Sequence, residues 1–207
     1  AKSSHELSSQ FSWDRNKLFS IDKIMSYPWS KTDPFTENLP LDCPVGIPVN
    51  LTVEYWFKKN NVNHHPNSHH SFTPRAGLIR FLSVLEGDDS KKSYKRLHRW
   101  RYSPTACYGN NEVHLHPYQA RRISVAEALA IQSLPPEFEL PSKMSLTDMF
   151  KSTGNGVPFL AAKGLATTIN EFLVGNFSSS RSAAIDPNHH LRTLHLEKQL
   201  SLLDLTR

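Results

Sequence analysis

The clearest pattern of hydrophobic positions lies toward the C-terminal end, where apolar residues recur at helical spacing over 157–174. Residues three and four apart fall on one face of a helix, so this spacing predicts a single amphipathic helix. A first turn tolerates proline and a glycine often follows a helix end, which fits Pro158 and Gly175. We expect the apolar face to be mostly buried; it comprises Leu160, Leu165, Ile169 and Phe172.

Two further helices are predicted from capping residues rather than from periodicity. A serine three residues before an acidic residue has the N-cap and N3 spacing of a capping box, whose side chains bond the first N–H groups. This spacing occurs twice and predicts helices over 124–134 and 145–150, the first ended by consecutive prolines. The residues concerned are Ser124 with Glu127, Ser145 with Asp148, and Pro135 with Pro136.

The N-terminal third of the chain has weaker patterns. Residues 1–50 are rich in prolines and read as loops, apart from a short apolar-striped segment at 18–27 that predicts a helix. The stretch LTVEYWFKK at 51–59 fits either a strand or a short helix.

Residues 60–70 are polar and predict a loop. Its histidines lack a Cys or carboxylate at ligand spacing, so no metal site is expected there; they are His64, His65, His69 and His70.

From 77 to 120 the patterns favour strands joined by long connections. The stretch YSPTACY at 102–108 is typical of a strand, and EVHLH at 112–116 alternates polar and apolar residues as a second strand does. The Gly-Asn-Asn turn between them predicts a hairpin. Together with the helices that follow, these segments predict a mixed α/β protein.

Composition and charge narrow the class of protein. The chain has 207 residues, a mean hydropathy of −0.47 and a net charge of +5, which permits an anionic partner without requiring one. It has no run of about 18 apolar residues and no secretory signal, so no membrane-spanning helix is expected. Two cysteines, Cys43 and Cys107, favour an intracellular protein with reduced thiols. The missing initiator Met indicates a fragment or a processed product.

The turn Gly154-Asn155-Gly156 precedes the long helix and is the first candidate for binding chemistry. The first N–H groups of a helix lack partners within it, glycine permits close approach and positive φ, and an Asn amide can bond a ligand. On this stretch alone, the simpler interpretation is a helix entry built from turn residues.

A series of short motifs in a set order is more specific. It runs through Ser103-Pro104-Thr105, His116-Pro117, Arg122, Glu127, Gln132, Pro135, Phe150 and Gly154-Asn155-Gly156-Val157-Pro158. In this order and spacing the chain resembles the C-terminal part of the DNA cytosine-5 methyltransferases, including the ninth and tenth motifs of that family. The resemblance is strong from about 94 to 173, weaker over 45–93 and absent at both ends.

The resemblance implies a fold and a cofactor. A small, irregular β recognition lobe would precede C-terminal helices that complete a Rossmann-like methyltransferase domain. The implied parts are a loop-rich segment, a target-recognition region, a region with the family motifs and a tail with a short helix, at 1–59, 60–120, 121–175 and 176–207. The implied cofactor is S-adenosyl-L-methionine, bound beside Asn155, Gly156 and Val157. Structural roles are implied for Arg122, Glu127, Gln132 and Pro158.

The implied partner is double-stranded DNA. The segment KKSYKRLHRWR at 91–101 interleaves basic residues, which neutralise phosphates, with aromatic residues that can stack or wedge. The alternative is a solvated basic loop with Trp100 in the core. Given the resemblance, we expect DNA contacts from Lys95, Arg96, Arg99, Arg101, Thr105, Tyr108 and Asn110.

The residues that carry the chemistry of the family are not found in the sequence. The family reaction uses a Cys nucleophile after prolines and a Glu in a Glu-Asn-Val turn. Cys43 follows an Asp and Cys107 lies inside a predicted strand, so no catalytic residue is assigned. We expect an intracellular, DNA-associated part of a DNA cytosine-5 methyltransferase, inactive alone, whose catalytic Cys and Glu lie on an N-terminal segment or partner subunit. The alternative is a non-catalytic DNA-binding or regulatory protein.

Overall fold

The computed structural model describes the chain in five stretches, residues 21–73, 78–91, 93–106, 108 and 112–174. Two units are distinguished, Ser26–Thr167 and a second made of Ala1–Met25 with Thr168–Arg207, and each is described by itself. Of the predicted site residues, Asn110 lies outside the described residues and all others belong to the larger unit.

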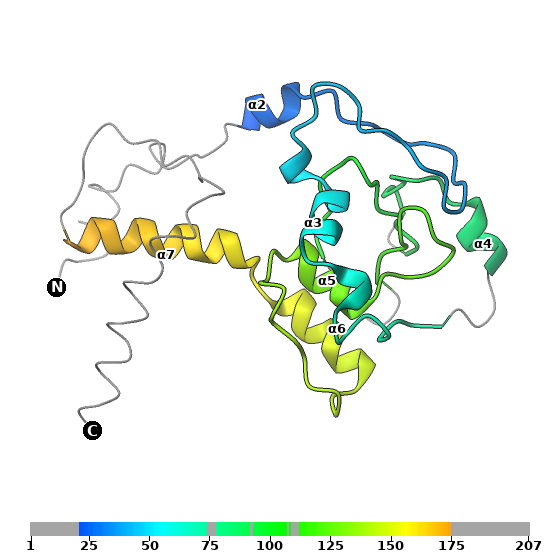
Figure 1. The fold of residues 1–207 in the computed structure, drawn as a ribbon. Coiled ribbons are helices and arrows are strands. Elements are labelled where there is room, and N and C mark those ends of the chain that lie inside the picture. Colours follow the sequence, from blue (N-terminus) through cyan, green and yellow to red (C-terminus); the bar gives the residue numbers. More distant parts are fainter. Residues whose placement is uncertain (1–20, 74–77, 92, 107, 109–111, 175–207) are drawn as a thin grey trace. The chain divides into compact units, whose positions relative to one another are not determined.

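Helices are the regular elements of the described residues. In chain order they are α2 (Ile21–Ser26), the 3₁₀ helix η2 (Val49–Leu51), α3 (Val53–Lys59), η3 (Val62–His64), α4 (Leu78–Ser83), α5 (Val125–Ile131), α6 (Leu146–Asn155) and α7 (Phe159–Val174). Figure 1 shows α3, α5 and α6 together in the larger unit, where α5 contacts both others. In the stretches that the structure describes, extended segments meet in isolated bridges and form no sheet. The described part is therefore mixed and largely helical, and its extended segments do not form the predicted strand-based lobe.

The segment 51–59, which fitted either a strand or a helix, forms α3 because its start is well capped. The Thr52 hydroxyl accepts a hydrogen bond from the backbone N–H of Tyr55 at 3.3 Å. The backbone N–H groups of Val53 and Glu54 donate to the carbonyls of Arg101 and Arg99, each at 3.0 Å. These bonds satisfy the groups that a helix start leaves without partners.

Helix α5 is the centre of the core. The predicted capping box is present, because the Ser124 hydroxyl accepts from the Glu127 N–H at 3.2 Å and the Glu127 carboxylate accepts from the Ser124 N–H at 2.7 Å. Residues 125–130 are all buried, and Phe150 of α6 stacks on Phe72 nearby. Both N-cap predictions are confirmed. Helix α5 ends before the prolines, at 131 rather than 134.

Helix α7 follows the predicted period, but its predicted burial is wrong. The helix begins at Phe159 rather than 157, because Gly156 has an extended backbone. None of its residues is buried: Leu165 is 53% exposed and Ile169 45%, while Leu160 and Phe172 are half-buried. At 16 residues it is the longest described helix, and no helix among the described residues is long and apolar enough to cross a membrane.

The turn of the predicted hairpin, residues 109–111, lies outside the described residues, and its second segment pairs with segments other than 102–106. Leu115 bridges to Arg96 on one side and to Arg122 on the other. This arrangement buries three apolar side chains completely, those of Leu97, Leu115 and Ile123. The alternating pattern of 112–116 therefore indicated a segment that takes part in β-bridges, but the local sequence did not indicate which segments pair with it. The strand-rich region also contains a helix, α4, that the pattern missed.

The proline-rich N-terminal segment is fastened to the core over residues 33–41, which we call the strap. Four side chains or backbone groups of the core hold it through hydrogen bonds. These join Asp33 to the His98 ring (2.8 Å), the Asn38 N–H to the Tyr118 carbonyl (2.8 Å), the Leu39 carbonyl to the Arg99 guanidinium (2.6 Å) and the Leu41 carbonyl to the Trp100 indole (3.1 Å).

The histidine-containing segment 60–70 is a loop that holds another loop in place. His65 contacts the Phe138 carbonyl at 3.1 Å, and the Asn67 side chain bonds both the N–H and the carbonyl of Leu140 at 2.8 and 3.0 Å. Among the described residues no group of three or more His, Cys, Asp or Glu side chains could hold a metal ion. The buried His65 and Asn67 hold residues 138–140 in place through these bonds.

Candidate functional site

The turn between α6 and α7 is the most exposed of the predicted sites. Gly154 and Asn155 complete the last turn of α6, and Gly156 is its C-cap, with φ −70° and ψ 152°. Gly154 and Gly156 therefore both lack the positive φ that glycine was expected to supply here. Asn155, Gly156 and Val157 are exposed, Val157 to 69%. An amide next to an accessible apolar side chain suits a nucleoside, which needs both a polar partner and an apolar wall.

Gly154 is required for a close approach. A Cβ atom at this position would lie 3.0 Å from the backbone nitrogen of Tyr108 and 3.5 Å from the Ala106 carbonyl oxygen. The segment that follows Ser-Pro-Thr thus packs directly against the end of α6. Tyr108 is buried in this contact, with its ring edge-on to Phe150 at 5.6 Å.

We predict that Gly154→Ala destabilises the chain by about 1–3 kcal/mol, because a methyl group there overpacks a backbone neighbour. Gly164→Ala is the matched control: it also lies within a helix, but its Cβ would meet nothing within 4 Å. That control should gain about 0.5–1 kcal/mol from helix propensity alone. Urea unfolding of both variants measures the difference, and an equal gain for the two would contradict the close approach.

The residues of the ninth motif form a buried ionic cluster. The Arg121 guanidinium donates to both Glu127 carboxylate oxygens, at 2.8 and 2.6 Å, and His116 Nε2 lies 3.5 Å from Oε1. Burial alone would raise the pKa of Glu127, but the hydrogen bonds from Arg121 and the charges around it outweigh burial and lower it. Burial lowers the pKa of His116 to about 3, so that ring is neutral.

Arg122 and Gln132 also bond to backbone carbonyls. The buried Arg122 guanidinium donates to the Val113 carbonyl, and the Gln132 amide donates to the Thr153 carbonyl at 3.1 Å. Gln132 therefore links the end of α5 to the end of α6. Pro158 is exposed, and its carbonyl accepts from the Ala162 N–H in the first turn of α7 at 3.0 Å.

Arg96, expected to contact DNA, is buried inside the protein, with 1% of its surface exposed. Its guanidinium donates to four backbone carbonyls and lies 3.9 Å from the centre of the Phe35 ring; the acceptors are Phe81, Val84, His116 and Gln119. Burial lowers the pKa of Arg96 to about 10, which leaves it charged at neutral pH. The expectation that this side chain contacts phosphates is therefore corrected.

Arg99 is corrected for the same reason. It is 5% exposed and pairs with the buried Glu86 through two bonds of 2.8 Å, from Nε to Oε1 and from Nη2 to Oε2. Its third bond holds the strap at the Leu39 carbonyl. Tyr108 is likewise buried, so its ring is not presented to a ligand.

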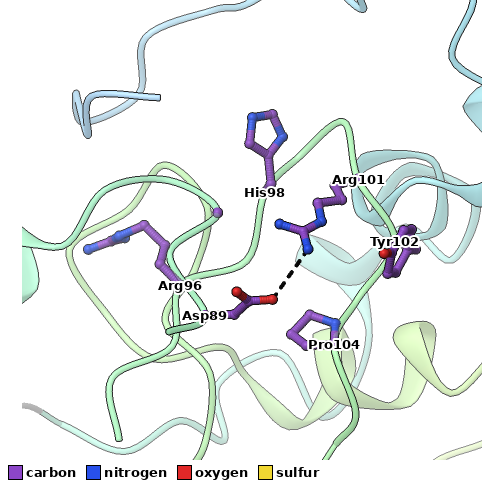
Figure 2. Close-up of a pocket in the computed structure, with 7 residues that line it drawn as sticks. Asp89, Arg96, His98, Arg101, Tyr102 and Pro104 are labelled. Carbon is purple, nitrogen blue, oxygen red and sulfur yellow. Dashed lines mark hydrogen bonds and ion pairs between the residues drawn. The ribbon is translucent and has the colours of Figure 1, made fainter. Parts of the chain in front are cut away.

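Lys95, Arg101 and Thr105 remain accessible for DNA. Thr105 is exposed, and Lys95 and Arg101 are half-buried. Figure 2 shows the Arg101 guanidinium directed at the Asp89 carboxylate, 3.4 Å away, beside Tyr102 and Pro104. The hollow that these residues line has a volume of about 10 Å³. This is room for about one water molecule, so it is not a nucleoside pocket.

Cys43 has none of the features of an activated nucleophile. Burial raises the pKa of its thiol, and its Sγ lies 3.7 Å from the Pro44 carbonyl oxygen. A reactive thiol needs the opposite shift, from a nearby cation or helix N-terminus. Cys107 lies outside the described residues.

Comparison with known proteins identifies the family. Residues 37–171, more than half of the chain, match the family described as C-5 cytosine-specific DNA methylase. The chain belongs to this family. A curated relative, the type II methyltransferase M.NmeDI of Neisseria meningitidis serogroup C, is 55% identical over 174 residues, which are 78% of this chain and 41% of that protein.

Two less similar relatives are also named type II methyltransferases. The putative M.OihORF3336P of Oceanobacillus iheyensis is 42% identical over 62 residues, 30% of this chain and 13% of that protein. M.AquIB of Picosynechococcus sp. is 30% identical over 91 residues, 40% of this chain and 66% of that relative. M.AquIB is therefore shorter than this chain, whereas the chain spans less than half of M.NmeDI.

Sequence reasoning missed two residues on which the site depends. Glu86 neutralises Arg99 inside the fold, and its only local signal is the following Gly87, which adopts a positive φ of 84°. Ser133 follows α5 with a positive φ of 54°. Glycine commonly occupies this position after a helix, and the sequence alone does not show that Ser133 adopts the left-handed conformation there.

Proposed function

We propose that this chain is the C-terminal part or small subunit of a DNA cytosine-5 methyltransferase, which supplies DNA target recognition and one wall of the S-adenosyl-L-methionine pocket. The catalytic Cys and Glu would come from the remainder of the enzyme. The observation that carries the proposal is the contact at Gly154, which packs the segment after Thr105 against the end of α6, immediately before the exposed residues Asn155–Val157. DNA-facing and cofactor-facing residues thereby share one packed unit.

Each proposed contact has a distinct task. The cofactor, when bound, supplies the methyl group. The Asn155 amide and the exposed Val157 side chain would hold its nucleoside, while Thr105 approaches the strand from which the cytosine leaves the stack. Lys95 and Arg101 would neutralise phosphates, and each contact would contribute about 0.9 to the salt dependence of binding.

The missing part of the enzyme would cover the apolar face of α7. Leu165, Ile169 and Leu173 recur at intervals of four residues, and all three are exposed. A row of this kind on a helix normally faces a packed neighbour. The match to 41% of M.NmeDI leaves more than half of that relative unaccounted for, and the small size of M.AquIB supports a chain that functions as a separate subunit.

Co-expression with the part of M.NmeDI that this chain does not match tests the proposal. We expect no methyl transfer from the 207-residue chain alone and transfer to duplex DNA from the assembled pair. Leu165→Glu should prevent assembly, whereas Thr167→Glu, an exposed polar position on the same helix, should not. Robust activity of the purified chain alone would refute the proposed division of labour.

A further inference from the structure

The end of α5 has an unusual residue at a demanding position. The Ser133 N–H donates to the Ala130 carbonyl at 2.9 Å, and the Leu134 N–H donates to the Leu129 carbonyl at 3.2 Å. These two bonds form a Schellman motif, in which the residue after the C-cap adopts the left-handed conformation and is usually glycine. Ser133 occupies that position with φ 54°. A side chain there is unfavourable for the backbone alone, which points to a use for the hydroxyl.

The Ser133 hydroxyl bonds the first turn of α7. It accepts from the backbone N–H of Leu160 at 3.0 Å, while the carbonyl of the preceding Gln132 accepts from the Phe159 N–H at 2.8 Å. Two of the N–H groups that a helix start leaves without partners are thus satisfied by the end of α5.

The same pair of residues holds both ends of the exposed turn. On the α6 side, the Gln132 amide donates to the Thr153 carbonyl at 3.1 Å. On the α7 side, Gln132 and Ser133 accept from Phe159 and Leu160. The turn Asn155–Val157 lies between these attachments and is itself exposed.

We propose that Ser133 is a positioning residue for the cofactor: its hydroxyl fixes the start of α7, and thereby the placement of Asn155 and Val157. This inference rests on the proposed function, because it assigns the turn to the cofactor pocket. Ser133 does not touch the cofactor itself. Its effect is to hold the turn in the binding conformation before the ligand arrives, which saves the free energy of ordering it later.

Ser133→Gly separates this role from a purely structural one. Glycine suits the left-handed conformation better than serine, so the Schellman motif should be kept and the unfolding midpoint of the full chain should stay the same or rise. The hydroxyl acceptor is lost, so hydrogen exchange at the Leu160 amide should become faster. In the enzyme assembled with its missing part, the dissociation constant for S-adenosyl-L-methionine should rise about two- to tenfold, the range for one hydrogen bond, with kcat unchanged.

Ser133→Asn is the rescue variant, because asparagine tolerates the left-handed region and offers an amide oxygen to the Leu160 N–H. It should recover part of the slower exchange and of the affinity. Unchanged affinity in Ser133→Gly, or a loss of affinity only in step with a loss of stability, would overturn the positioning role. If the assembled wild-type enzyme neither binds the cofactor nor transfers methyl groups, the proposed function itself fails, and that result is distinct from an unresponsive Ser133→Gly variant.

Discussion

Arg96→Met should destabilise the chain by about 3 kcal/mol or more, since three buried carbonyls and one partly buried carbonyl lose their donor and each buried loss costs about 1–3 kcal/mol. Small domains have only about 5–15 kcal/mol in total, so the variant should be close to unfolding at room temperature. Urea unfolding followed by circular dichroism measures the effect.

Lys91→Met is the matched control, because Lys91 is an exposed cation of the same basic segment. Its effect on stability should stay within about 0.5 kcal/mol. An Arg96→Met variant with a normal unfolding midpoint but a weaker salt dependence of DNA binding would show that Arg96 contacts DNA and does not support the fold. Replacing Arg96, Arg99 and Arg101 together would therefore report on folding before it reported on phosphate contacts.

Stability should fall steeply as the pH drops from about 7 toward 4. Burial, reinforced by nearby cations, lowers the pKa of His114 to about 4, and burial lowers that of His116 to about 3. Both values lie below the value of about 6.5 in an unfolded chain. Below pH 6.5, His114 and His116 therefore bind protons in the unfolded chain but not in the folded chain. Above pH 6.5 they are neutral in both states. Two such groups give a slope of about 2.7 kcal/mol per pH unit near pH 5.

Unfolding midpoints measured between pH 7.5 and 5 check this slope. His114→Phe keeps a ring against Tyr108, whose ring centre lies 5.4 Å from that of His114, and should reduce the slope by about half. His64→Gln changes an exposed histidine and should leave the slope as it is. An unchanged slope in His114→Phe would show that the buried ring is not the group responsible.

The features predicted correctly from sequence are local ones. The helix starts at Ser124 and Ser145 depend on groups three residues apart, and the period of α7 depends on spacing within one helix. Such signals act over a single turn, so the sequence displays them directly. The exposed turn Asn155–Val157 was also found, although its contact with a cofactor stays a prediction.

The errors concern contacts between distant segments. Arg96 and Arg99 looked like a solvent-facing basic run because their acceptors, such as the Val84 carbonyl and the Glu86 carboxylate, lie 12 and 13 residues away. Leu115 was paired with the wrong segment for the same reason. A guanidinium carries the same charge whether it meets a phosphate or a carbonyl, so composition alone does not distinguish these roles.

If the chain recognises its DNA target as proposed, the strap limits where target specificity can be exchanged between relatives. A chimera joined at residue 60 would combine the strap of one parent with the proposed recognition region of another. It would separate Asp33 from its His98 partner, and the Leu39 and Leu41 carbonyls from the Arg99 and Trp100 side chains that donate to them. A junction placed before Asp33 keeps these partners from one parent. Under the proposed function, in which residues 60–120 recognise DNA, the unit of exchange therefore begins before that region, and successful specificity swaps should inherit the strap.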